Sequence, residues 1–506
     1  MKKYARISVV WTACLCLLLS GCAVQTVKQP LSESAFNEAS ASASYDHGTS
    51  DMPVEVNDSD FITPEGFTTT APPSRTESTS PSADAGAVLS ETSAASSTRI
   101  TQTVSPSAPA SAAARPTVSA SGTTAPSSSV PVPVPQASTN EIRAVWISYL
   151  DFSSLTKDRS EKAFRNIAGS MIRNIRDGRM NTVFLQVRPA SDAMYRSSLY
   201  PYSAYISGTE GKDPGYDALA IFCDCARQAG LSIHAWINPF RVGDASKFDQ
   251  KAASNPAKQI LSDNDPNNDA RIVRVGSSLY FDPADPENQQ LILAGVRELL
   301  QNYAIGGIHI DDYFYPSTDL FIDQKDFDAY IAQGGTEARA DWRRTQINTL
   351  VSSMYTCVKS FGSQKIFSIS PAMEIEKNRS TMYADVARWA SYGGYCDWLI
   401  PQVYVGFSNQ THPFRETVRE WLSLKRSASV RLLFGLAAYK CGTEDKYAGS
   451  GSREWIENTD ILSRQIAFLR SFDGSSGFAL FSYAYTFGEK MSNNSKLEMK
   501  NVINML

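Results

Sequence analysis

Histidine is scarce in this sequence: the 506 residues include four, of which His234, His309 and His412 follow residue 140. No HxH, HExxH or Asp-rich loop pattern is present, and such spacings are the usual signature of zinc and calcium sites. A metal-dependent hydrolase such as a deacetylase is therefore the weakest function class, and we predict no metal and no cofactor. The sequence also lacks the GxSxG motif of a nucleophilic serine.

An excess of basic charge is missing as well. The formal net charge is -4 and the isoelectric point about 5.8. A nucleic-acid-binding protein needs a basic patch or stripe, so we predict no nucleic-acid partner. No segment after the first residues is apolar for long enough to span a membrane.

The beginning of the chain has the composition of a processing signal. Basic residues are followed by an apolar run over residues 7–19, which ends in Leu-Ser-Gly-Cys22. This arrangement resembles a bacterial lipobox, in which the cysteine becomes the lipidated N-terminus after cleavage. We predict a lipoprotein signal peptide over residues 1–21 and a lipid on Cys22. The protein would then be extracytoplasmic and anchored to the cell membrane.

Residues 22–138 contain few aromatic side chains and are dominated by Ser, Thr, Ala and Pro. Such a segment cannot bury enough apolar surface to offset the entropy of ordering its backbone. We predict a disordered tether, stiffer where prolines repeat, that lets a folded domain extend away from the membrane.

The cysteines show no disulfide framework. Outside the predicted signal peptide and Cys22, the sequence has five cysteines and no CxxC pair: Cys223, Cys225, Cys357, Cys396 and Cys441. We predict buried free thiols, with a single disulfide as the alternative.

From residue 139 onward, short β-branched and aromatic runs alternate with amphipathic helical stretches. We predict eight strands, over residues 143–149, 182–187, 232–237, 307–311, 365–370, 397–404, 431–437 and 477–483. Between them we predict helices over residues 161–177, 216–229, 287–303, 338–361, 382–391, 417–425, 458–472 and 496–505. This repetition indicates an α/β fold, a (β/α)₈ TIM-type barrel over residues 139–506. The rival, a doubly wound open sheet, is weakened because no GxGxxG or P-loop follows the first strand.

The longest interruption, residues 241–282, follows the third strand and includes a predicted hairpin around Gly276-Ser277. A long loop after a barrel strand lies on the face where barrel active sites are built.

Side chains of a barrel strand alternate between the interior and the helix-covered exterior. Applied to the predicted strands, this alternation brings a set of polar residues to one end of the barrel: Gln186, Arg188, Asn238, Asp311, Asp312, Gln402 and Tyr404. Burying a polar group without a partner costs roughly 2–7 kcal/mol, so such a gathering favours a functional site. An ordinary polar layer is an equally good interpretation of Gln186 or His309 taken alone.

Carboxylates and flat rings at this end favour carbohydrate chemistry. Glycoside hydrolysis needs one protonated carboxyl group and one ionised one. Asp311 and Asp312 are the strongest candidates, but adjacent side chains diverge, so a partner from another strand is expected. Glu374, Glu376, Asp192 and Asp151 remain open as that partner, whereas Asp397 opens its strand and is expected to be structural. Trp146, Trp236, Tyr313, Tyr315, Tyr404 and Tyr483 lie near strand ends, where rings can stack on sugars or simply pack.

Several segments together carry a family resemblance: EIRAVWI from Glu141, NTVFLQVRP from Asn181, IHAWINP from Ile233, YFDP from Tyr280, GIHIDDYFYP from Gly307, SISP from Ser368 and PQVY from Pro401. Their order along nearly the whole region after residue 140 is similar to the glycosyl-hydrolase-like 10 family. The resemblance implies a TIM-type barrel related to glycoside hydrolases, often on lipoproteins, with members thought to act on bacterial cell-wall glycan.

By this resemblance, Asp311 and Asp312 match the acidic pair of the family's fourth strand. Gln186, Arg188, Asn238 and Gln402 match other polar positions of its barrel mouth. The stretch around Glu374 departs from the family's pattern, which has amide or small residues there. We therefore list Asp311, Asp312 and Glu374 as candidate catalytic residues. The candidate substrate-binding residues are Gln186, Arg188, Trp236, Asn238, Tyr313, Gln402 and Tyr404.

The leading hypothesis is a monomeric surface lipoprotein that hydrolyses β-linked amino-sugar glycan, namely peptidoglycan strands. The alternative is a lipoprotein that binds glycan without cleaving it. A second carboxylate about 5–10 Å from the Asp311 and Asp312 carboxyls would favour the enzyme.

Overall fold

The computed structural model describes residues 140–506. The predicted signal peptide (residues 1–21), the lipidation of Cys22 and the predicted tether (residues 22–138) lie outside the described residues. No helix in the described part of the chain is both long and apolar enough to cross a lipid bilayer.

A closed barrel of parallel strands forms the centre of the fold, in the order β1-β11-β10-β9-β8-β7-β3-β2. The strands are β1 (Ile142–Ile147), β2 (Thr182–Arg188), β3 (Ser232–Ile237), β7 (Gly307–Ile310), β8 (Ile366–Ile369), β9 (Trp398–Leu399), β10 (Arg431–Leu436) and β11 (Ser475–Leu480). The predicted (β/α)₈ barrel is confirmed. β9 is much shorter than predicted because Pro401 has no N–H to donate to a neighbouring strand.

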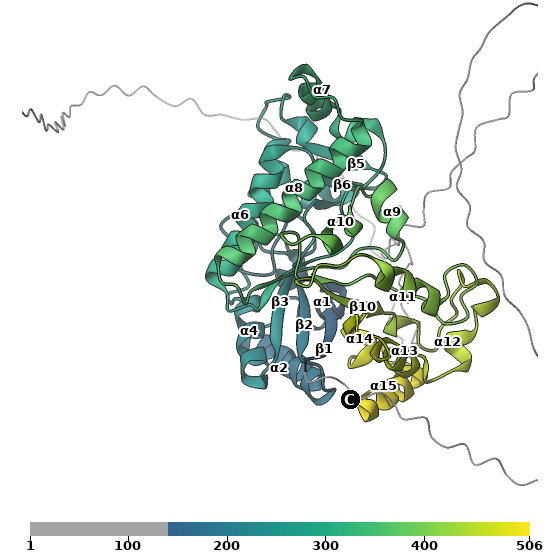
Figure 1. The fold of residues 1–506 in the computed structure, drawn as a ribbon. Helices are drawn as coiled ribbons and strands as arrows, with labels where there is room; N and C mark the ends of the chain where they lie inside the picture. The colour runs from purple at the N-terminus through teal and green to yellow at the C-terminus, as the bar shows by residue number, and fades with distance from the viewer. Residues whose placement is uncertain (1–139) are drawn as a thin grey trace, which may run out of the picture. The chain divides into compact units, whose positions relative to one another are not determined.

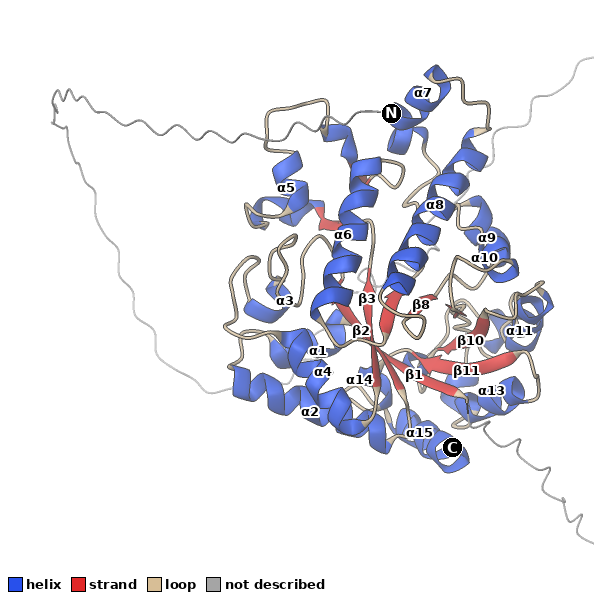
Figure 2. Cartoon of the chain, turned by 60° about the vertical axis from the view of Figure 1, so that its left-hand side comes forward, coloured by secondary structure: helices blue, strands red, loops and turns tan. Residues whose placement is uncertain are grey.

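Helices cover the outside of the barrel (Figure 2). The longer ones are α2 (Glu161–Asp177), α4 (Ala218–Ala229), α6 (Pro286–Asn302), α8 (Arg339–Ser360), α11 (Phe414–Ser423), α13 (Ile461–Arg470) and α15 (Asn493–Met505). Shorter ones are α1 (Tyr149–Thr156), α3 (Ala204–Ser207), α5 (Pro256–Ile260), α7 (Gln324–Ala332), α9 (Ile375–Ser380), α10 (Val386–Ser391), α12 (Glu454–Glu457) and α14 (Tyr483–Thr486). The predicted helix over residues 382–391 begins later, at Val386, since Asp385 caps it by accepting from the N–H of Arg388.

The insertion after β3 carries a small antiparallel sheet in the order β4-β6-β5. Its strands are β4 (Arg241–Asp244), β5 (Ile272–Val275) and β6 (Ser278–Phe281). The predicted hairpin around Gly276-Ser277 is confirmed, since Val275 pairs with Ser278. Figure 1 shows β5, β6 and α7 at the end of the barrel opposite α15, so the insertions after β3 and β7 extend the C-terminal face of the strands.

The predicted alternation of strand residues is confirmed for most positions. Trp146, Phe184, Trp236 and Ile400 belong to a cluster inside the barrel, while Val183 and its alternate neighbours pack with the helices in the larger outer core. Inside the barrel, the indole N–H of Trp146 donates to His309 Nε2 at 3.0 Å, and Phe184 stacks on the same imidazole. Burial holds the pKa of His309 well below 6.5, so the ring is neutral. His309 and Trp146 are therefore core residues.

The five cysteines of the described region are all free thiols. Cys225 is half-buried and the other four are buried, which agrees with the prediction of free thiols over a disulfide.

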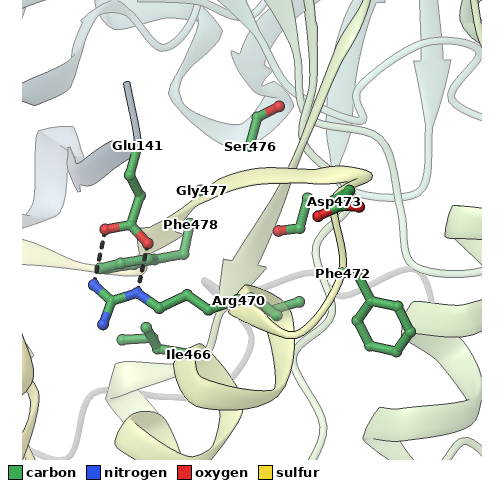
Figure 3. Close-up of a pocket in the computed structure, with 10 residues that line it drawn as sticks. Glu141, Ile466, Arg470, Phe472, Asp473, Ser476, Gly477 and Phe478 are labelled. Atoms are coloured by element: carbon green, nitrogen blue, oxygen red, sulfur yellow. Dashed lines mark hydrogen bonds and ion pairs between the residues drawn. The ribbon is translucent and has the colours of Figure 1, made fainter. Parts of the chain in front are cut away.

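A cavity of about 230 Å³ lies at the N-terminal end of the barrel strands, opposite the face that carries the loop insertions (Figure 3). A bidentate ion pair lines one side of this cavity: the guanidinium of Arg470 donates to the two carboxylate oxygens of Glu141 at 2.8 and 2.9 Å. Their side chains are only 5% and 6% exposed. The pair joins the start of β1 to the end of α13, the helix that precedes β11. It therefore links the first strand of the barrel to the segment that leads into the last strand.

We expect Glu141→Ala to lower the free energy of unfolding by about 3–5 kcal/mol, because it leaves the Arg470 guanidinium buried without a counter-charge. Chemical denaturation of the variant and the parent would measure this difference. Arg453→Ala, which breaks an exposed pair with Glu457 (both side chains more than half exposed), is the matched control and should change stability by less than about 1 kcal/mol. Equal effects of the two substitutions would contradict the assignment.

Candidate active site

Asp311 and Asp312 follow β7 directly, at the C-terminal end of the barrel. The Asp311 side chain is held by nitrogen donors: Asn238 Nδ2 lies 2.7 Å from both carboxylate oxygens, and the indole N–H of Trp236 donates to Oδ2 at 3.0 Å. Only 5% of Asp311 is exposed. Trp236 and Asn238, two consecutive inward-facing residues at the end of β3, thus hold the Asp311 carboxylate in place.

A second layer of hydrogen bonds fixes the orientation of Asn238. The backbone N–H of Tyr149 donates to Gln186 Oε1 at 3.1 Å, which leaves the Gln186 amide nitrogen to donate to Asn238 Oδ1 at 2.7 Å. Because that oxygen is occupied, the NH₂ group of Asn238 must face Asp311. Gln186 therefore acts through Asn238, as a positioning residue.

Asp312 has a more open environment. Its carboxylate accepts from Gln402 Nε2 at 3.1 Å, and the same NH₂ group donates to the Ser370 carbonyl at 3.0 Å. Gln402 is the one side chain that donates to Asp312 among the described residues, and Asp312 is half-buried where Asp311 is buried. Asp312 is therefore the member of the pair that a ligand can reach.

Burial raises the pKa of both carboxyl groups. For Asp311, burial and then the negative charge of Asp312 raise the pKa, against the donors from Asn238 and Trp236. For Asp312, burial raises the pKa while Gln402 and Lys377 oppose it. Two such neighbours titrate as a pair, which retains a proton at neutral pH.

Hydrogen-bond geometry decides which carboxyl carries that proton. Asn238 Nδ2 and Trp236 Nε1 can only donate, so a proton on either oxygen of Asp311 would face another hydrogen. Asp312 has a single side-chain donor, from Gln402, and is more exposed than Asp311. We infer that Asp311 is ionised and Asp312 protonated, the arrangement of an acid beside a fixed negative charge.

Two rings border the carboxyl pair. The charges of Asp312 and Asp311 help to raise the pKa of Tyr313 and of Tyr404, after the larger effect of burial on each. Tyr404 packs against the rings of Tyr439 and Phe481, with centroids 5.9 and 5.7 Å away.

The sequence model of the Glycosyl hydrolase-like 10 family matches residues 141–450, from the residue before β1 to beyond β10. This chain belongs to that family. It is 30% identical over 380 residues to glycosyl hydrolase YngK of Bacillus subtilis, covering 70% of each chain. It is also 30% identical over 399 residues to glycosyl hydrolase DigH of Escherichia coli K12, covering 72% of this chain and 87% of DigH.

Among solved structures, the glycoside hydrolase domain of PgaB from Bordetella bronchiseptica matches with 13% identity and a TM-score of 0.48, over 72% of this chain and 99% of that domain.

Within this member of the glycosyl hydrolase-like 10 family, most of the predicted mouth residues come together. Gln186, Trp236, Asn238, Tyr313, Gln402 and Tyr404 lie around Asp311 and Asp312. Trp236 was predicted as a sugar-stacking ring, but its N–H is committed to Asp311 and it is 5% exposed. Its position supports Asp311 and leaves little ring surface for a sugar.

Arg188 does not join this group, contrary to the predicted inward direction. The pairing of β2 with β3 shifts between Gln186 and Arg188, so that Arg188 lies opposite Ile237, an outer-core residue. Its guanidinium lies 4.8 Å from the Tyr200 ring centroid, and it is 1% exposed. The irregularity in the strand reverses the alternation on which the prediction depended.

The structure does not bring Glu374 into contact with the pair. Glu374 precedes α9, its side chain is 42% exposed, and its Oε2 lies 3.9 Å from His412 Nε2. No third carboxylate is among the groups that chiefly set the pKa of Asp311 or Asp312 in the described region. A catalytic role for Glu374 stays a prediction.

The other candidates for a partner carboxylate are occupied elsewhere. Asp151 accepts from both the N–H and the hydroxyl of Ser148, from Ser482 and from the N–H of Ala484, which makes it a structural cap between α1 and α14. Asp192 is buried beside Lys251 and Ser203. As predicted, Asp397 lies at the base of its strand, where it accepts from the N–H of Phe367 and pairs with Lys359.

Two cations near the pair were not predicted. Arg241 begins β4, and its guanidinium carbon lies 5.9 Å from the Tyr313 ring centroid. Lys377 on α9 lowers the pKa of Asp312 through its charge. Arg241 lies shortly after Asn238 at the start of the long loop, and this position is the sequence signal from which its place near the pair could have been predicted.

If Asp312 acts as the acid, we expect the rate of glycan cleavage to fall as pH rises through the pKa of the carboxyl pair, which burial raises above the usual range of an aspartate. Above this pH the pair loses the proton that assists the leaving group, so the rate drops about tenfold per unit. A profile of kcat/KM between pH 5 and 10 would test this. A rate that stays level to pH 10 would show that no proton of this pair is needed.

Proposed function

We propose that this protein is a glycoside hydrolase that cleaves β-linked amino-sugar glycan of the bacterial cell wall, with peptidoglycan strands as substrate. The observation that carries the proposal is the carboxyl pair at the barrel mouth, in which Asn238 and Trp236 fix Asp311 beside a more exposed Asp312 and burial raises the pKa of both carboxyl groups. Membership of the glycosyl hydrolase-like 10 family and the names of the relatives support the same reaction class.

Each member of the pair has a distinct role in this proposal. Asp312 donates its proton to the oxygen of the departing sugar, and the glycosidic bond breaks as that proton is transferred. Positive charge then develops on the sugar ring, and the negative charge of Asp311, pre-oriented by Asn238 and Trp236, stabilises it. Water supplies the new hydroxyl group, and its other proton returns to the Asp312 carboxylate, which restores the acid. Gln402 and Tyr404 border the space in which the sugars lie.

In this proposal Asp311 stabilises the positive charge and does not attack the sugar, so the attack is assigned to a further group. Glu374 could serve through a movement of the loop before α9. The acetamido group of an amino sugar is the other route, since some glycosidases use this substrate group as the nucleophile.

We further propose that the enzyme is a lipoprotein held at the cell membrane through a lipid on Cys22. The length and composition of residues 22–138 suit a tether that lets the barrel reach the wall. Labelling cells with radioactive palmitate would test this, since Cys22→Ser should remove both the label and the membrane association.

The rival function is glycan binding without cleavage, and it is favoured because no third carboxylate of the described residues contacts the pair. Incubation of the full-length protein with peptidoglycan, intact or stripped of stem peptides, separates the two when soluble products are analysed by mass spectrometry. The proposal predicts released sugar fragments. Co-sedimentation with the glycan but no released fragments would replace the enzyme with a binding protein.

A further inference from the structure

Arg241 is a half-buried cation near the barrel mouth, and no carboxylate of the described residues forms an ion pair with it. It begins β4, lies opposite Tyr280 of β6 in the small sheet, and faces the ring of Tyr313, the residue after Asp312. Tyr149 and Tyr205 also act on its charge, and their own rings pack with centroids 4.5 Å apart. Four tyrosines, from α1, α3, β6 and the segment after β7, thus act on the charge of this one guanidinium.

Three other shielded arginines have carboxylate partners, whereas Arg188, which is 1% exposed, lies against the Tyr200 ring without one among the described residues. Arg343 pairs with Asp323 at 2.6 Å, Arg470 with Glu141 at 2.8 Å, and Arg271 with Asp285 at 3.2 Å. In the described part of the chain, no carboxylate lies within 4.0 Å of the Arg241 guanidinium, and none of its N–H groups has a recorded hydrogen bond. Withdrawing a cation from water without a counter-charge is costly, and aromatic faces offset only part of that cost.

The catalytic carboxyls do not supply the missing partner. Asp311 is engaged by Asn238 and Trp236, and Asp312 by Gln402, and neither forms an ion pair within 4.0 Å with Arg241. The guanidinium donors are thus left for a group that comes from outside the protein.

A second cation lies on the other side of the pair. In the barrel order, β7 carries the carboxyl pair between β3, which leads into Arg241, and β8, which leads into α9 and Lys377. Lys377 acts on the charge of Asp312 and, like Arg241, has no carboxylate within 4.0 Å among the described residues. The mouth therefore presents positive charge on both sides of its acid, a pattern that suits an anionic strand.

We propose that Arg241 binds a carboxylate of the substrate glycan next to the linkage that is cleaved. This inference rests on the proposed function and deepens it. The planar guanidinium matches a carboxylate with two parallel hydrogen bonds, which an ammonium cannot reproduce. Cell-wall glycan offers two sources of this group: the lactyl ether on every second sugar, which is a free carboxylate only when no peptide is attached, and the peptide itself.

Three substrates distinguish these sources: strands stripped of peptide, stripped strands whose carboxyl groups have been reduced to alcohols, and intact strands. For stripped strands, Arg241→Gln should raise KM about tenfold to a hundredfold, the loss of hydrogen bonds to a charged group, with kcat changed less than threefold. Arg241→Lys should raise KM by less, because lysine keeps the positive charge but cannot form the two parallel hydrogen bonds of the guanidinium. For reduced strands, the parent enzyme should have the KM of the Gln variant, and the substitution should have no further effect.

Intact strands identify the source of the carboxylate. If the sugar's own carboxylate is bound, the parent enzyme has the same KM for intact strands as for reduced strands. If a peptide carboxylate is bound, Arg241→Gln raises KM on intact strands as well. Arg388→Gln is the matched control, since Arg388 stacks on Tyr392 and Tyr395 but is exposed on α10, and it should leave every KM unchanged.

Arg241 would have no anion-binding role if Arg241→Gln altered KM equally for stripped and reduced strands, or altered only kcat or thermal stability. Failure of the proposed function is a separate result, because it would appear as no cleavage of any strand by the parent protein. In that event, the affinities of the parent and Arg241→Gln for stripped and reduced strands still test the anion site: a preference for stripped strands that the variant loses supports it, and equal affinities overturn it.

Discussion

Asp312→Asn should abolish release of sugar fragments while leaving glycan binding intact. The substitution keeps the shape of the side chain, and its amide can still accept from Gln402, so the mouth is preserved. It removes the proton that assists the leaving group, and loss of general acid catalysis costs about 10²–10⁴ in rate. Rates on stripped strands, together with co-sedimentation of the variant, would measure both effects.

The matched control for this prediction is Asp319→Asn, on the loop after β7, which changes a carboxylate whose hydrogen bond comes from Ser317. It should retain the parental rate. Full activity of Asp312→Asn would remove Asp312 from the chemistry, and loss of binding together with activity would mean that Asp312 chiefly binds substrate.

Asn238→Leu should lower kcat by about 10²-fold and move the basic limb of the pH profile upward. Asp311 would lose the donor that contacts both of its oxygens, so its ionised form would be less stable and its pKa would rise further. The carboxyl pair would then keep its proton to a higher pH, which moves the basic limb upward, and less of that proton would be on Asp312, which lowers kcat. Removing the preoriented donor costs a rate factor of about this size, as other donors to charged catalytic groups do.

A purely structural role for Asn238 would change stability and leave the pH profile alone. Asn255→Leu is the comparison: it removes another buried amide, one that bonds Ser191 and Glu210, away from the carboxyl pair. We expect it to lower the unfolding temperature without moving the pH limb. If Asn238→Leu behaves in the same way, the hydrogen-bond chain from Tyr149 to Asp311 serves packing only.

Strand alternation accounts for how much of the site could be predicted. In β3 and β7, regular pairing from His234–Gly307 to Ile237–Ile310 keeps Trp236 and Asn238 next to Asp311, so a rule of period two was sufficient. In β2 the same rule placed Gln186 correctly and failed for Arg188, because a register shift of one residue turns the side chain outward. Such an irregularity depends on the neighbouring strand and leaves no mark in the local sequence.

The contacts of the predicted residues were harder to predict from the sequence than their positions in the barrel. The sequence placed Trp236 at the mouth, but only the geometry shows that its N–H is directed at a carboxylate and not at a sugar. Arg241 was missed because it lies in the small sheet that leaves the barrel after β3, where strand alternation no longer applies. Glu374 was chosen from its place after the fifth strand, yet α9 leaves its side chain near His412.

Cleavage in water enriched in oxygen-18 tests the central claim most directly. Full-length protein would be incubated with peptide-stripped strands, and the mass of each new sugar end would be measured. If the carboxyl pair hydrolyses the glycosidic bond, every cut adds a single heavy oxygen to the new reducing end, and Asp312→Asn produces no labelled ends. Fragments without the label would show that the bond is broken without water, and equal labelling by Asp312→Asn would show that another group does the chemistry.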